Sequence, residues 1–186
     1  MKSYKFILLV LLLLCNNVNS QVSNGKWEKI SGYESLNSVC FVSTNIGYAV
    51  GLDGVILKTT DAGITWNKVQ TSTLNALNKL RFINSNVGFA VGENGTILKT
   101  IDGGDTWEQQ NSTAYTTAGE SWFNFVHFFD ANNGVSFGDA VAGEFEIYTT
   151  ADGGETWDPV PGANIPNPLG SGATIEYGYN GGNVTI

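Results

Sequence analysis

The amino-acid sequence predicts an all-β fold: a β-propeller of four-stranded antiparallel blades, with about three complete blades and parts of others in an incomplete ring. Three observations lead to this prediction. One phrase recurs three times, as ILKTTDAGITW, ILKTIDGGDTW and IYTTADGGETW, and ends at Trp66, Trp107 and Trp157. The spacings of 39 residues from Trp27 to Trp66, then 41 and 50, give a repeat of about 40 residues. The segments between the turns are short, β-branched or aromatic, and bounded by Gly, Asn or Asp, which is typical of strands.

Residues 1–20 are predicted to be a signal peptide. A short basic region opens the chain, and an uninterrupted run of nine apolar residues extends from Phe6 to Leu14. Nine residues are too few to cross a bilayer, which takes roughly 20. We therefore expect an exported protein that is secreted, periplasmic or held at the cell surface. Acylation of Cys15 in a lipoprotein is an alternative, but leucines precede Cys15 where a small residue is expected, so membrane anchoring is disfavoured.

Each repeat is predicted to contain four strands in a fixed order. The copies align as an apolar segment, a polar turn ending in glycine, a short strand, a second glycine turn, an ILKT-type strand, an Asp-Gly turn and a strand opening with Thr-Trp. Four short antiparallel strands in about 40 residues is the size of a propeller blade. The partial propeller is expected over residues 21–186, with blades over about 35–70, 76–110 and 120–160 and the start of a fourth blade over 173–186.

The two ends of the chain lead us to interpret it as a fragment of a larger protein, or as a chain that completes its ring with another copy. Residues 26–30 match the last strand of a blade without the strands that should precede it. Residues 173–186 resemble opening strands without the rest of their blade. Propellers typically need 4 to 8 blades to close.

The recurring Asp–Gly–Thr–Trp turn is predicted to be structural. Its Asp can accept backbone N–H bonds, and the Gly can take a positive φ at little steric cost. The Thr can add a hydroxyl bond across the turn, and the Trp offers a large apolar area to pack between blades. A catalytic residue is normally needed once, so recurrence in every blade favours this interpretation. The residues given these roles are Asp61, Gly63, Thr65, Trp66, Asp102, Gly104, Thr106, Trp107, Asp152, Gly154, Thr156 and Trp157.

Composition excludes several classes of function. Without the signal peptide the chain has 7 basic and 17 acidic residues, which argues against nucleic acids and anionic membranes as partners. Beyond the signal peptide the sequence contains one cysteine, Cys40, so we expect no intrachain disulfide and a small buried hydrophobe at that position. One histidine and one cysteine exclude an ordinary zinc site, no phosphate-binding loop is present, and no cofactor is expected.

The three phrases resemble the Asp-box (BNR) repeat family, whose pattern is Ser/Thr-x-Asp-x-Gly-x-Thr-Trp. Residues 59–66, 100–107 and 150–157 each match it. The preceding GYAVGxxGxILKT run is more similar to photosystem II stability/assembly-factor repeats than to sialidases, and related repeats occur in sortilin-type propellers. The resemblance covers about residues 27–160. It implies a propeller that assists in building a membrane protein complex, although one fold hosts many functions.

Two enzymatic hypotheses can be weighed against the residues. A sialidase typically uses several arginines to hold its substrate carboxylate, and the only arginine here is Arg81, which disfavours that activity. A glycosidase needs two carboxylates. The insertion in the third copy adds acidic residues to the blade that contains the only histidine, so a candidate ligand site comprises Asp139, Glu144, Glu146 and His127. The competing interpretation is a longer polar hairpin with His127 on a partly exposed strand.

The leading hypothesis is an exported, non-catalytic propeller module that binds a protein or glycan or scaffolds an assembly. The alternative is a fragment of a secreted carbohydrate-active enzyme whose catalytic residues lie partly in other blades. We favour the non-enzymatic interpretation, with no catalytic, metal or cofactor-binding residue assigned.

Overall fold

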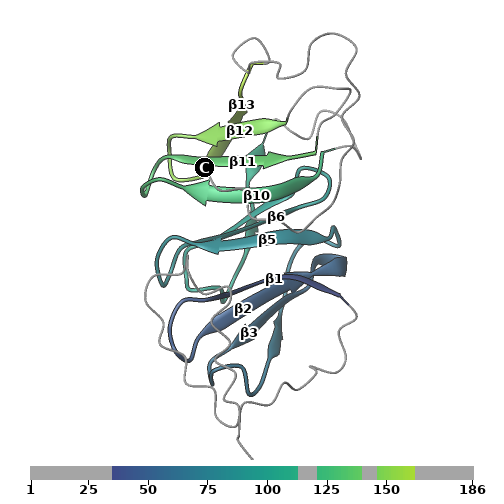
Figure 1. Ribbon diagram of the computed structural model, residues 1–186, viewed down its shortest axis with the longest axis vertical. Helices are drawn as coiled ribbons and strands as arrows, with labels where there is room; N and C mark the ends of the chain where they lie inside the picture. Colours follow the sequence, from purple (N-terminus) through teal and green to yellow (C-terminus); the bar gives the residue numbers. More distant parts are fainter. Residues whose placement is uncertain (1–34, 113–120, 140–145, 162–186) are drawn as a thin grey trace, which may run out of the picture.

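A computed structural model describes residues 35–112, 121–139 and 146–161, which form three β-sheets stacked side by side (Figure 1). The first sheet contains β1 (Leu36–Phe41), β2 (Gly47–Gly51), β3 (Ile56–Thr59) and β4 (Asn67–Val69). The second contains β5 (Leu77–Phe82), β6 (Gly88–Gly92), β7 (Ile97–Thr100) and β8 (Glu108–Gln109). The third contains β10 (Phe123–Phe128), β11 (Gly134–Gly138), β12 (Ile147–Thr150) and β13 (Thr156–Pro159), with β9 (Asn111–Ser112) at its edge.

The predicted all-β propeller architecture is confirmed, and the described residues form an arc of three blades rather than a closed ring. Within each blade, consecutive strands pair antiparallel. The first strands of the blades, β1, β5 and β10, lie next to one another. The predicted signal peptide, residues 1–20, and the predicted fourth-blade segment, residues 173–186, lie outside the described residues.

The strand β9 departs from the predicted four-stranded blade. It follows the last strand of the second blade directly, yet it pairs in parallel with β13 of the third blade, with Thr156 opposite Asn111 and Trp157 opposite Ser112. The chain thus covers part of the outer edge of the third blade before it enters that blade. An edge strand otherwise leaves unpaired N–H and C=O groups that invite association.

The turns after β2 and β6 are built on Asp-Gly and Asn-Gly pairs. Asp53 and Gly54 have φ values of 54° and 63°, and Asn94 and Gly95 have values of 52° and 64°. Positive φ at both central residues is the requirement of a type I′ hairpin turn, which Asn-Gly and Asp-Gly satisfy best. A short 3₁₀ turn, η1 (Leu52–Gly54), coincides with the first of them.

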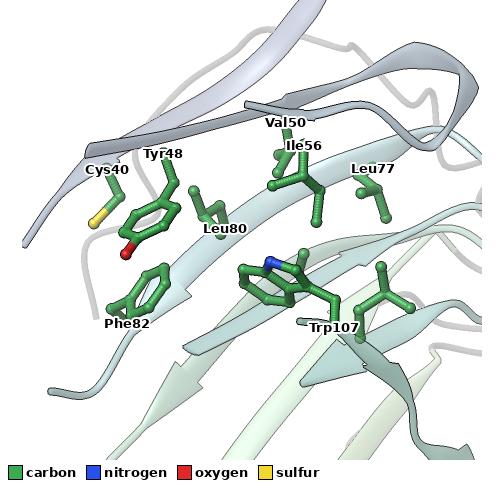
Figure 2. Packing of buried hydrophobic residues seen from close by; sticks show 10 residues of the cluster. Cys40, Tyr48, Val50, Ile56, Leu77, Leu80, Phe82 and Trp107 are labelled. Carbon is green, nitrogen blue, oxygen red and sulfur yellow. The ribbon is translucent and has the colours of Figure 1, made fainter. Parts of the chain in front are cut away.

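Two hydrophobic layers hold the three blades together. The layer between the first and second blades contains Tyr48, Val50 and Ile56 on one side and Leu77, Leu80, Phe82 and Trp107 on the other (Figure 2). The layer between the second and third blades contains Phe89, Val91 and Ile97 against Phe123, Val126, Phe128 and Trp157. Each blade therefore buries one face against each neighbour, as stacked repeats must.

The same aromatic contact occurs in both layers. The ring of Tyr48 stacks on Phe82 with centroids 4.3 Å apart, and Phe89 stacks on Phe128 at 4.4 Å. The tryptophan of the following Asp-box turn contacts the phenylalanine edge-on. The ring centroids of Phe82 and Trp107 lie 5.9 Å apart, with an angle of 87° between the ring planes. Such pairs contribute about 0.5–1.5 kcal/mol each beyond the area they bury.

Cys40 corrects one expectation from the sequence. It is a buried residue of the first layer, only 7% exposed, but it is also disulfide-bonded. The expectation of an unbridged Cys40 applies to a chain without residues 1–20, whereas in the chain of residues 1–186 Cys40 is bridged. The other cysteine of the chain, Cys15, lies outside the described residues.

The blades have two distinct ends. The Asp-box turns, which follow β3, β7 and β12, lie beside the turns that follow β1, β5 and β10. In each blade one backbone N–H of the box donates to a carbonyl of the earlier turn at 2.9 Å, from Ala62 to Asn45, Gly103 to Asn86 and Gly153 to Asn132. We call this the box end, and we call the end with the turns after β2 and β6 the opposite end. Among the described residues, no helix is long and apolar enough to cross a membrane.

Candidate functional site

Each Asp-box turn is closed by hydrogen bonds to the carboxylate of its own aspartate. In the second blade, Oδ1 of Asp102 accepts from the Thr100 hydroxyl at 2.8 Å and from the Thr106 backbone N–H at 2.9 Å. Its Oδ2 accepts from the Thr106 hydroxyl at 2.6 Å. Asp61 and Asp152 accept the corresponding bonds in the other two blades. Both oxygens of each carboxylate are thus engaged within the turn.

These hydrogen bonds favour the charged form of the carboxylates. The hydroxyl and backbone N–H of Thr106 lower the pKa of Asp102 from 3.8 to about 2. The pKa of Asp152 is lowered by Thr156 in the same way, and that of Asp61 by Thr65. Carboxylates held in the charged form in this way are poor general acids near neutral pH.

The threonine that opens each Asp box also stabilises the turn by hydrogen bonds of its hydroxyl group. Thr59, Thr100 and Thr150 are buried, and each hydroxyl oxygen accepts from the backbone N–H of the box glycine at 2.9 Å. The same hydroxyl donates to the aspartate, so its hydrogen-bonding capacity is satisfied despite burial.

The second and third Asp-box turns also rest on the preceding blade. Gly104 has φ +74°, and a Cβ at this position would lie 2.4 Å from Cε1 of Tyr48. Gly154 has φ +81°, and its Cβ would lie 2.4 Å from Cε1 of Phe89. In the first blade the nearest atoms to a Cβ on Gly63 are 3.7 Å away. Glycine is therefore required for close approach in the second and third boxes, in addition to its backbone conformation.

A lysine on the third strand of one blade reaches the box of the next. Nζ of Lys58 lies 2.6 Å from Oδ1 of Asp105 and donates to the Gly103 carbonyl at 2.8 Å. Nζ of Lys99 lies 2.5 Å from Oε1 of Glu155. From the sequence, these lysines are expected only as residues of the ILKT-type strands. The signal was nevertheless present, because a lysine and an acid recur at fixed positions of successive copies.

Two positions interrupt this recurrence. Ile64 occupies the acidic position in the first box and is 80% exposed. Thr149 occupies the lysine position in the third blade, where it is also exposed. The lysine–acid pair is consequently seen at the two junctions between described blades and at neither outer face of the arc.

Asparagine side chains join the first strands of successive blades. Nδ2 of Asn37 donates to the Leu77 carbonyl at 3.0 Å, and Nδ2 of Asn78 donates to the Phe123 carbonyl at 3.1 Å. A β-bulge occurs beside each of these asparagines, between Leu36 and Ser38 and between Leu77 and Lys79. The bulge turns the amide toward the next blade, and no sequence signal short of the alignment of copies would have revealed it.

The acidic residues of the candidate ligand site lie at the opposite end. Asp139 is exposed and accepts from Nδ2 of Asn124 at 2.8 Å. Glu146 accepts from the Ser121 hydroxyl at 3.0 Å, and burial raises its pKa. Its second oxygen is buried and has no hydrogen-bond partner. Glu144, the fourth member of this candidate set, lies outside the described residues.

The structure does not bring His127 to these acids. Asp139 and Glu146 flank the paired ends of β11 and β12, whereas His127 lies near the far end of β10, opposite Val135. Its ring contacts Phe129 with centroids 5.1 Å apart. Partial burial and the charge of Arg81 lower the pKa of His127 below 6.5. Among the described residues, no group of three His, Cys, Asp or Glu side chains could hold a metal ion.

Comparisons with known proteins show what this chain is similar to. A family model described as photosynthesis system II assembly factor YCF48 matches residues 65–167. A solved structure described as YCF48 bound to D1 peptide aligns with a TM-score of 0.55 and 22% identity, over 67% of this chain and 39% of that one. YCF48 from Cyanidioschyzon merolae aligns with a TM-score of 0.59 and 19% identity, over 76% of this chain and 46% of that one. The chain thus spans less than half the length of either structure, and no curated protein sequence matches it significantly.

Proposed function

Because the chain belongs to the family of the photosynthesis system II assembly factor YCF48, we propose that it is an exported, non-catalytic propeller module that binds a protein partner and supports assembly of a membrane protein complex. The non-catalytic part of the proposal rests on the hydrogen bonds that the box aspartates accept. All three carboxylates accept bonds from their own turn threonines, so these recurrent acids serve the turns.

A protein partner is favoured over a glycan. The YCF48 structure most relevant to this question holds a peptide, D1. Within the described residues, the large aromatic side chains of the two layers pack between blades, and Trp122 and Phe129 are the aromatic side chains that stay exposed. Export is supported by the basic and apolar residues that open the sequence, 1–20.

Cross-linking in the cells that produce the protein tests the binding role. The full chain would be cross-linked in the intact cell and purified, and its covalent partners identified by mass spectrometry against an unrelated exported protein as control. The proposal expects reproducible cross-links to subunits of one membrane complex or its assembly intermediates. Cross-links distributed as in the control would contradict it.

Two further measurements address the other parts of the proposal. The mass of the native protein should correspond to a chain that begins at Gln21, and a native protein that retains Met1 would overturn export. Hydrolysis of a glycoside by the purified protein, lost in Asp139→Asn, would overturn the non-catalytic assignment and favour the carbohydrate-active alternative. Asp105→Asn is the matched control, because it removes an exposed carboxylate at the box end.

A further inference from the structure

A cavity of about 360 Å³ opens at the box end of the arc. It lies among the ends of β1, β5 and β10 and the turns that follow them, so all three blades contribute to its wall. Four phenylalanines are among its lining residues, Phe41, Phe82, Phe128 and Phe129, and Phe129 is the most exposed of them. Its volume is at the small end of the range for ligand pockets, about 300–1,000 Å³.

Arg81 brings a positive charge to this cavity. Its side chain is half-buried, and its Nε is buried without a hydrogen-bond partner. Within the described residues, Arg81 forms no salt bridge, because the ion pairs there are Lys58–Asp105 and Lys99–Glu155. A buried donor without a partner is energetically costly, and more so when the group is charged, so this guanidinium is an unpaired cation in the cavity wall.

The other polar residues of the cavity are already occupied by their own turns. Asp130 uses Oδ1 to accept from the backbone N–H groups of Asn132 and Asn133, at 2.7 and 2.8 Å. Its Oδ2 accepts from the Asn133 side-chain amide at 2.8 Å. Asn84 accepts from two backbone N–H groups of its turn in the same manner. The one carboxylate in the cavity wall is therefore committed, and it leaves Arg81 unpaired.

We infer that this cavity binds a carboxylate carried by an apolar group, with Arg81 as its anchor. A planar guanidinium offers two parallel N–H bonds to a carboxylate. The exposed ring of Phe129 would receive the apolar part of the ligand. The site is independent of the assembly role proposed above, because it rests on the cavity and on one unpaired cation.

The single histidine of the chain provides a direct readout. His127 contacts Phe129, which lines the cavity, and it senses the charge of Arg81. Because the chain contains one histidine, the imidazole C–H signals of the untagged full chain are unambiguous in a proton NMR spectrum. N-acetylphenylalanine and N-acetylphenylalaninamide form a matched probe pair, because the second has a neutral amide in place of the charged carboxylate.

Titration of the full chain with both probes at about 150 mM salt tests the inference, since overall charge repulsion is then screened beyond about 8 Å. The acid is expected to shift the His127 signals saturably and to bind at least tenfold more tightly than the amide. Equal binding of the acid and the amide would overturn the inference without the need for any variant. A third probe, the amide of N-acetyl-Phe-Glu, distinguishes a side-chain carboxylate from a chain-end carboxylate as the preferred source.

Variants then assign the effect to Arg81. Arg81→Gln is expected to weaken binding of the acid at least tenfold, and Arg81→Lys to restore only part of it, because lysine keeps the charge but loses the planar fork. Lys79→Gln is the matched control: it removes a charge two residues away on the same face of β5, from a residue outside the cavity lining. Unchanged binding in a folded Arg81→Gln, or an equal loss in Lys79→Gln, would overturn the assignment.

Discussion

The ammonium nitrogen of Lys58 lies 2.6 Å from Oδ1 of Asp105, and this contact ties the third strand of one blade to the Asp-box turn of the next. The lysine side chain is 19% exposed and the aspartate 72%. The lysine also donates to the Gly103 carbonyl at 2.8 Å and lies 5.6 Å from the centre of the Tyr48 ring. The two partners are therefore unequal, since the lysine has several contacts and the aspartate side chain is mostly in water.

This asymmetry predicts that mutation of the two partners lowers the free energy of unfolding by unequal amounts. Asp105→Asn should lower the free energy of unfolding by less than about 1 kcal/mol, because an exposed ion pair is weak. Lys58→Met should cost about 1–2 kcal/mol, because it also removes a charged hydrogen bond and a contact with an aromatic ring. Urea unfolding of the two variants and of the double variant measures both effects. A larger loss for Asp105→Asn than for Lys58→Met would contradict the interpretation.

The box glycines offer a matched series. Gly63, Gly104 and Gly154 all have φ between +74° and +87°, so alanine adds a similar backbone strain of about 1–2 kcal/mol at each position. Only at Gly104 and Gly154 would the new Cβ lie 2.4 Å from a ring atom of the preceding blade. We expect Gly104→Ala and Gly154→Ala to lose a further 1–3 kcal/mol or so relative to Gly63→Ala. Thermal unfolding measures this, and equal losses in all three would show that docking of the box contributes nothing.

Ala62 is predicted to be a site of stabilisation. Its φ is 62°, whereas the corresponding residues of the other boxes are Gly103 and Gly153, with φ of 70° and 73°. Ala62→Gly relieves left-handed strain of about 1–2 kcal/mol and loses part of the gain to the greater freedom of the unfolded chain. A net gain of about 0.5–1 kcal/mol in the free energy of unfolding is expected. Ala62→Ser, which keeps the strain, is the control and should bring no gain.

The pKa of Asp102 predicts a defined acid response. Its value of about 2 in the folded protein is below the ordinary 3.8, so its contribution to stability is complete above pH 3.8 and is lost as the pH falls toward 2. Asp102→Asn should reduce stability at pH 7 by about 1–2 kcal/mol and should flatten the stability profile between pH 4 and pH 2. Urea unfolding at several pH values measures both. A profile as steep as that of the unmodified protein would contradict the prediction.

His127 should report the removal of Arg81. Partial burial and the nearby guanidinium lower the pKa of His127, so Arg81→Gln should raise this pKa toward 6.5. Because protonation is disfavoured in the folded state, stability should also fall less in Arg81→Gln as the pH drops through 6.5. NMR titration of the single histidine gives the pKa directly. Lys79→Gln should leave it unchanged, and a shift of the same size there would assign the effect to general charge rather than to Arg81.

The blades could be predicted from the sequence because their signals are local. Glycine-bounded apolar segments mark β2 and β6, and a repeat of about 40 residues sets the blade size. The two-residue strand β9 could not be predicted, because a segment so short has no periodicity and its partner, β13, is distant in sequence. The disulfide at Cys40 could not be predicted, because residues 1–20, which contain the other cysteine, have the sequence of a signal peptide.

The candidate site shows a different limit. His127 and Asp139 belong to the same copy of the repeat, and nearness in sequence suggested nearness in space. The antiparallel pairing of β10 and β11 separates them, since His127 pairs with Val135 while Phe123 pairs with Gly138, the neighbour of Asp139. The cavity around Arg81 could not be predicted either, because its wall is assembled from three blades whose mutual placement depends on packing.

The alternation of lysine and acid at the blade junctions has a consequence for how such a protein can change in length. The second blade contains both halves of the joint, Lys99 on one face and Asp105 on the other, whereas Ile64 and Thr149 stand at the corresponding positions of its neighbours. A tandem duplication of that blade would create a junction in which a lysine again meets an acid. The number of blades can thus increase by duplication of the second blade, and the lysine–acid pair at the new junction needs no further substitution.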